Sequence, residues 1–146
     1  LMLYGISPFA ESTGADLGLR PAMTLESHVI AVKELSAGER VGYGGTWIAP
    51  RATRLAVAAA GYGDGYPRNT ATGTPVLVNE TPARLVGRVS MDMLTIDVTE
   101  LPQVAVGDPV LLWGSGVPVE TVAAAAGTIP YELVCRVSER VHIDVL

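Results

Sequence analysis

Apolar and polar positions alternate along much of the chain, with the period-two pattern of half-buried β-strands. The longest alternating segment is residues 22–35, with shorter ones at residues 75–79, 82–90 and 93–98. Two mostly apolar runs, residues 53–60 and 110–113, are typical of buried strands. We expect a first strand at residues 1–4 and a last one at residues 140–146.

Turn signals separate these segments. Residues 36–39 and 107–109 carry glycine beside small or acidic residues, and Asn79-Glu80 suits a hairpin turn. Glycines and prolines break any regular pattern before residue 20, which indicates a connector.

Two helices are expected late in the chain. Residues 118–127 are rich in alanine and end at Gly127, a helix stop signal. The next segment has Thr128 suited to the N-cap and Pro130 to the first turn. The sequence therefore predicts a mostly β protein, a barrel-like antiparallel β-domain with two short helices near the C-terminus.

Composition narrows the classes of function. The 146 residues fit one domain, and 49% hydrophobic against 17% charged residues allows a packed core. A net charge of −5 without a basic cluster argues against nucleic acid as a partner. Cys135 is alone and His28 and His142 are isolated, so no disulfide or metal site is expected.

No apolar run approaches the roughly 18 residues of a membrane span, and no secretion signal is visible, so a cytoplasmic protein is expected. The chain opens inside an apolar run without Met, and we expect a piece of a longer polypeptide.

The stretch Val-Gly-Tyr-Gly-Gly-Thr-Trp at residues 41–47 is the first candidate for chemistry. Its glycines suit a tight turn or close approach of a ligand, and they frame Tyr43, whose hydroxyl can donate or accept a proton. The alternative is a glycine-rich turn with a packing tyrosine.

Two further loops, residues 61–68 and 87–92, combine glycine with groups that recognise anions or move protons. Arg68 and Arg88 suit carboxylates, and Asp64 and Asp92 could orient them. We expect the three loops to meet on one rim of the barrel, a common position for a site. No Ser/His/Asp set or phosphate-binding loop accompanies them, so the pattern indicates half of a site, completed by another chain or domain.

The ordered motifs at residues 3–5, 41–47, 61–68, 87–92 and 131–135 resemble the C-terminal domain of bacterial alanine racemase. This resemblance runs nearly end to end with fitting spacings. It implies that residues 1–20 are the end of an upstream (β/α)₈ barrel and a linker, and that residues 21–146 are the C-terminal β-domain.

The resemblance also implies a cofactor, a substrate and a partner. The family binds pyridoxal 5′-phosphate through a Schiff-base lysine in the N-terminal barrel, so neither Lys33 nor any other residue here has that role. The enzyme is a head-to-tail homodimer in which each C-terminal domain closes the partner's active site. It interconverts L- and D-alanine for the cell wall, and this chain alone is expected to be inactive.

Site residues follow from the same resemblance. Tyr43 matches the catalytic tyrosine, which exchanges a proton with the substrate Cα on the face opposite the lysine. Tyr62 matches a residue lining the substrate entrance, and Met91 one whose backbone N–H meets the substrate carboxylate. Arg68, Arg88 and Asp92 match the entrance corridor. No metal is implied.

Plainer alternatives stand beside these assignments. The Met91 side chain could fill the core, and the corridor charges could be ordinary ion pairs on the rim. Glu139 stands where some members have a phosphate-contacting tyrosine, so we assign it no role. The domain as a whole could instead serve a serine or broad-specificity amino-acid racemase, or be a non-catalytic β-barrel dimerisation module.

Overall fold

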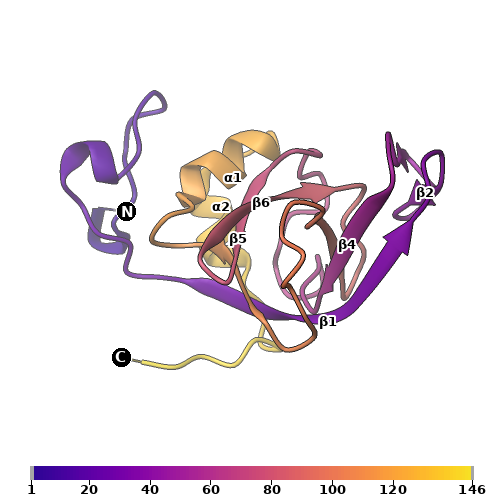
Figure 1. Ribbon diagram of the computed structural model, residues 1–146. Helices are drawn as coiled ribbons and strands as arrows, with labels where there is room; N and C mark the ends of the chain where they lie inside the picture. Colours follow the sequence, from indigo (N-terminus) through magenta and orange to yellow (C-terminus); the bar gives the residue numbers. More distant parts are fainter. Residues whose placement is uncertain (1, 146) are drawn as a thin grey trace.

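Six antiparallel strands close into a barrel in the computed structural model, which describes residues 2–145 (Figure 1). Around the barrel the strand order is β1-β4-β7-β6-β5-β8. The barrel strands are β1 (Leu25–Leu35), β4 (Thr53–Ala58), β5 (Pro75–Val78), β6 (Thr81–Val86), β7 (Leu94–Asp97) and β8 (Pro109–Trp113). The predicted barrel of mostly antiparallel strands is confirmed.

The long strand β1 closes the barrel because it pairs with two neighbours. Its first residues, from Leu25 to His28, pair with β8, and the remainder pairs with β4 as far as Leu35 opposite Thr53. The register shifts between Val29 and Ala31, an irregularity that bends a strand and increases its twist.

The Asn79-Glu80 turn joins β5 and β6 as predicted. Asn79 has φ 49° and Glu80 has φ 61°, the left-handed pair that matches the twist of a two-residue hairpin. Strand β6 begins at Thr81 and ends at Val86, short of the predicted residue 90. Gly87 has φ 74°, which takes the chain out of the ladder and into the next loop.

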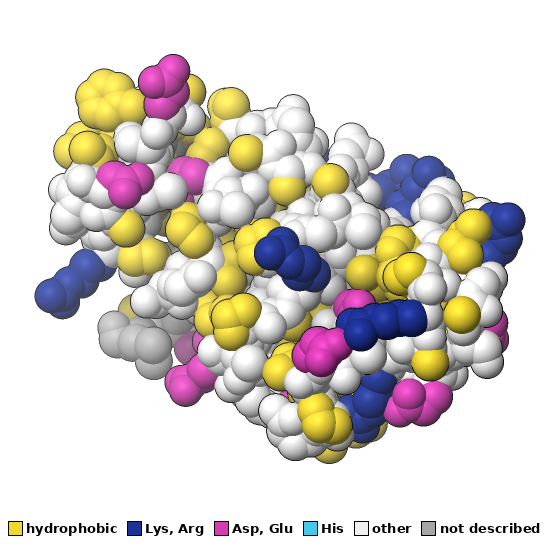
Figure 2. Space-filling model, turned by 45° about the horizontal axis from the view of Figure 1, so that its top comes forward, with side chains coloured by type: hydrophobic (Ala, Val, Ile, Leu, Met, Phe, Trp, Pro, Cys, Tyr) yellow, Lys and Arg dark blue, Asp and Glu magenta, His cyan; other side chains and the backbone are white. Residues whose placement is uncertain are grey.

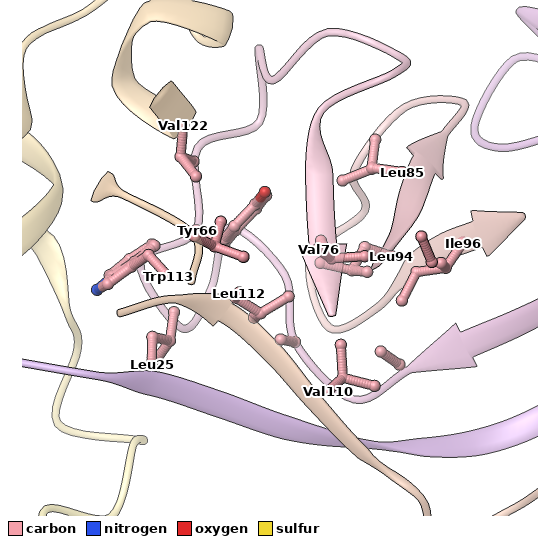
Figure 3. Packing of buried hydrophobic residues seen from close by; sticks show 14 of the residues in the cluster. Leu25, Tyr66, Val76, Leu85, Leu94, Ile96, Val110, Leu112, Trp113 and Val122 are labelled. Carbon is pink, nitrogen blue, oxygen red and sulfur yellow. The ribbon is translucent and has the colours of Figure 1, made fainter. Parts of the chain in front are cut away.

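Aliphatic side chains from alternate strand positions fill the barrel. Val76, Leu85 and Ile96 are fully buried there, together with the two stacked rings of Tyr66 and Trp113 (Figure 3). The ring centroids are 5.9 Å apart and the planes are inclined by 14°. This stack supplies bulk to a core that has few other aromatic residues.

Two short helices, α1 (Val119–Ala125) and α2 (Pro130–Arg136), cover one side of the barrel (Figure 1). Gly127 has φ 69°, as expected for a residue that ends a helix. Pro130 occupies the first turn of α2 as predicted, but the N-cap is Ile129 and not Thr128. The Thr128 hydroxyl instead hydrogen-bonds the Glu132 carboxylate one turn into the helix.

Both predicted terminal strands are absent from the described residues. Met2–Tyr4 forms a 3₁₀ turn, and residues 140–145 run without a strand partner, while Leu1 and Leu146 lie outside the described range. Apolar alternation alone made these ends resemble strands, but a strand needs a neighbour to satisfy its backbone groups.

The segment before β1 lies beside the helices, outside the barrel (Figure 1). It includes the 3₁₀ turn Ala15–Leu17 and is fixed by Glu120 of α1, whose Oε1 accepts hydrogen bonds from the backbone N–H groups of Ser7 (3.0 Å) and Gly14 (2.8 Å). Figure 2 shows hydrophobic side chains gathered on this segment, and exposed ones there include Leu3 and Phe9. Among the described helices, none has the length and apolar character to cross a bilayer.

Candidate functional site

Tyr43 stands near the tip of a small hairpin formed by β2 (Arg40–Val41) and β3 (Trp47–Ile48). Gly42, Gly44 and Gly45 all have positive φ, and the Gly45 N–H closes the turn on the Gly42 carbonyl at 3.0 Å. Tyr43 is 71% exposed. A packing role in the domain core, the alternative for this tyrosine, therefore does not describe it.

Strand connectivity alone would place this hairpin away from the other two loops. β1 ends where β4 begins, so residues 36–52 leave one end of the barrel. The pairing of Ala58 with Leu94 puts the end of β4 and the start of β7 at the other end, where residues 61–68 and 87–92 lie.

The hairpin reaches the other loops by folding back over the outer face of the barrel. Val41 packs with Leu55 and Val86 in a small hydrophobic cluster separate from the main core. Gly42 then lies against the 87–88 backbone: a Cβ at position 42 would be 2.9 Å from the Arg88 nitrogen. Burial of this second cluster thus places the Tyr43 loop beside the 87–92 loop.

The 61–68 loop contacts the later part of the 87–92 loop, at residues 90 and 91. The backbone N–H of Tyr62 donates to the Ser90 carbonyl at 3.0 Å, and that of Gly63 donates to the Met91 carbonyl at 2.9 Å. Tyr62 is 39% exposed and Met91 is 51% exposed. Met91 is therefore not a core methionine.

A depression of about 440 Å³ collects residues from all three loops. Thr46 comes from the first, Arg68 from the second, and Gly87 and Arg88 from the third, with Asn69, Thr70 and Thr72 completing the lining. Both arginines are exposed, and neither forms an ion pair with the described residues. Two free guanidinium groups on a polar surface can attract and orient a carboxylate.

The predicted pairing of Asp64 and Asp92 with these two arginines is wrong. Both aspartates face Arg140, whose Nη2 donates to Asp92 Oδ1 at 2.6 Å and whose Nε is 3.4 Å from Asp64 Oδ1. The pKa of Arg140 is raised, first by the hydrogen bond to Asp92 and then by the charge of Asp64. Sequence reasoning gave Arg140 no role, because nothing local connects it to loops about 50 and 75 residues earlier.

The fold and the loops together define a β-barrel domain that presents a tyrosine and two arginines at its surface. The family described as "Alanine racemase, C-terminal domain" matches residues 22–145, and the chain belongs to this family.

Similar proteins agree with that assignment. Alanine racemase from Laribacter hongkongensis is 60% identical over 142 residues, covering 97% of this chain and 40% of that protein. The one from Nitrosococcus oceani is 58% identical over 141 residues with the same coverage. The crystal structure of biosynthetic alanine racemase from Pseudomonas aeruginosa superposes with a TM-score of 0.93 at 54% identity, covering 96% of this chain and 39% of that one. The chain thus spans about 40% of the length of these relatives.

Proposed function

We propose that this chain is the C-terminal domain of a pyridoxal 5′-phosphate-dependent alanine racemase and supplies Tyr43 as an acid/base residue. The observation that carries the proposal is the exposed Tyr43 side chain on a hairpin whose Gly42 lies against the Arg88 backbone. A tyrosine that is exposed in its own domain and lies in a hairpin turn suits proton transfer to a substrate held by another domain. Membership of the family and the names of the similar proteins support the same function.

The chain's own residues fit a site shared with a second domain. Its one lysine, Lys33, is exposed on β1 and belongs to none of the three loops. Pyridoxal phosphate, when bound, supplies an electron sink for the charge left at Cα when a proton is removed. We therefore place the Schiff-base lysine in an N-terminal barrel outside this chain, and residues 1–20 at the junction with it.

Each loop then has a part in handling the amino acid. The Tyr43 hydroxyl gives a proton to Cα in one direction of the reaction and receives it in the other. The backbone N–H of Met91 donates to no acceptor within residues 2–145, so it is free to meet the substrate carboxylate. Tyr62 lines the entrance, and Arg68 and Arg88 attract the incoming carboxylate. Asp92 acts in the corridor indirectly, through its pair with Arg140.

The proposal includes the assembly and setting of the complete protein. In a head-to-tail homodimer, Tyr43 of one subunit would face the barrel of the other. The product D-alanine would serve cell-wall synthesis in the cytoplasm. The shared name of the relatives favours alanine over serine or a broad range of amino acids, and the exposed Tyr43 loop argues against a module that only pairs subunits.

The test is Tyr43→Phe in the complete protein, compared with Tyr131→Phe, which removes the hydroxyl of another exposed tyrosine on α2. Tyr43→Phe should lower racemisation by at least about 100-fold, the scale of a lost general acid or base, while cofactor absorbance is retained. In deuterium oxide, incorporation at Cα should fall mainly for one enantiomer. Near-normal turnover of both enantiomers would remove Tyr43 from the mechanism.

A further inference from the structure

Close packing against backbone atoms on two sides requires glycine at positions 61 and 65 of the 61–65 loop. A Cβ at Gly61 would be 2.3 Å from the Met91 carbonyl oxygen, and one at Gly65 would be 2.4 Å from the Arg136 carbonyl oxygen. A Cβ at Gly63 would be 2.3 Å from Nη1 of Arg140. The loop is therefore held between residues 90–91 on one side and the end of α2 with the residues that follow it on the other.

Arg140 forms ion pairs with an aspartate from each of the two loops. Its guanidinium contacts the carboxylates of Asp92 and Asp64, one from each loop, at 2.6 and 3.4 Å. Asp64 also uses Oδ2 to accept the Gly61 N–H at 2.9 Å, and its carbonyl accepts the Ser138 N–H at 3.1 Å. One side chain thus joins the loop that carries Tyr62 to the loop that carries Met91.

We propose that Arg140 is a positioning residue for the site, which sets the Met91 backbone N–H and the Tyr62 side chain relative to each other. This inference rests on the proposed function. Arg140 is 50% exposed, so its ion pairs contribute little to the free energy of unfolding. Their effect lies in geometry, because a displacement of about 1 Å in a group that positions the substrate can lower the rate by about 100-fold.

The matched comparison is Arg140→Ala with Arg136→Ala in the complete protein. The Arg136 side chain is 58% exposed and pairs with Glu132 on its own helix at 2.8 Å, so it makes no ion pair to the site loops. Arg140→Ala should lower kcat/KM by about 10- to 100-fold, mainly through KM for alanine, with little change in Tm. Arg136→Ala should leave kcat/KM within about twofold. Arg140→Lys should lower kcat/KM less than Arg140→Ala, because it keeps the positive charge. It should not match the wild type, because a single ammonium cannot reach two carboxylates as the guanidinium fork does.

Amide hydrogen exchange supplies a readout that does not depend on racemisation. In Arg140→Ala, exchange at the Tyr62 and Gly63 N–H groups, which donate to the carbonyls of Ser90 and Met91, should become faster than in Arg136→Ala. Equal exchange in the two variants, or an equal kcat/KM, would overturn the positioning role. If Tyr43→Phe leaves racemisation intact, the proposed function fails, and the exchange data still decide whether Arg140 holds the two loops together.

Discussion

Gly42 lies so close to Arg88 that a Cβ at position 42 would be 2.9 Å from the Arg88 backbone nitrogen. This contact joins the hairpin that carries Tyr43 to the loop that carries Met91. Gly42 also has φ 83°, a conformation that L side chains rarely adopt.

Gly42→Ala should therefore displace Tyr43, and Gly44→Ala is its control. Gly44 has a similar φ of 78° on the other side of Tyr43, but a Cβ at position 44 would meet no atom of the described residues within 4 Å other than those of its two chain neighbours. Both variants should lose about 1 kcal/mol of stability through backbone strain. Only Gly42→Ala should also lower kcat, by about 10-fold or more, as expected for a misplaced catalytic group. Steady-state kinetics and thermal unfolding measure the two effects. Equal loss of kcat in both variants would attribute the effect to strain and not to the contact with Arg88.

A second prediction concerns Tyr66, whose hydroxyl is buried without a hydrogen-bond partner among the described residues. The Thr70 hydroxyl donates its proton to the Pro67 carbonyl at 2.7 Å and therefore does not donate to Tyr66. Tyr66→Phe keeps the ring stacked on Trp113 and removes the unpaired group, so it should stabilise the protein by about 1 kcal/mol. Tyr131→Phe, at an exposed position, should change little. Urea unfolding at neutral pH measures both, and a loss of stability in Tyr66→Phe would show that the hydroxyl has a partner.

The burial of Tyr66 also predicts that the stability of the wild type and of Tyr66→Phe will depend differently on pH in alkaline solution. Burial raises the pKa of the Tyr66 hydroxyl far above its usual value of 10.0. The unfolded state therefore loses its proton first, so this titration leaves the free energy of unfolding unchanged below pH 10.0 and lowers it as the pH rises above that value. Between about pH 10 and 11, the wild type should lose stability faster than Tyr66→Phe. Parallel unfolding curves against pH for the two proteins would contradict the burial of an unpaired hydroxyl.

The turn between β5 and β6 offers a test of backbone strain far from the site. Glu80 has φ 61° and is exposed. Glu80→Gly should stabilise the protein by about 1 kcal/mol, because glycine adopts a left-handed conformation without the cost of a Cβ. The same change at Glu26, exposed within β1, should destabilise it by a similar amount. Differential scanning calorimetry decides the sign at each position, and a lower Tm for Glu80→Gly would contradict the prediction.

The sequence by itself determined the features that depend on neighbouring residues. Alternation revealed the long strand β1, Asn79-Glu80 marked the hairpin between β5 and β6, and Gly127 and Pro130 marked the helix ends, because each signal reflects a local backbone preference. The same local signals were wrong at residues 2–4 and 140–145, where no neighbouring strand among the described residues pairs with them. The motif at residues 41–47 identified Tyr43 as a candidate, although its position relative to the other loops was open.

Only the tertiary structure decided how the three loops are arranged. Val41 covers Leu55 and Val86 on the outside of the barrel, and this burial carries Tyr43 back to Arg88 from the far end of β1. The tertiary structure also pairs Asp64 and Asp92 with Arg140. Arg68 and Arg88 line the depression and form no ion pair with other described residues. Hydrophobic contacts and ion pairs of this kind act between residues distant in sequence. The sequence therefore identifies candidate site residues, whereas the packing of the chain determines which residues they contact.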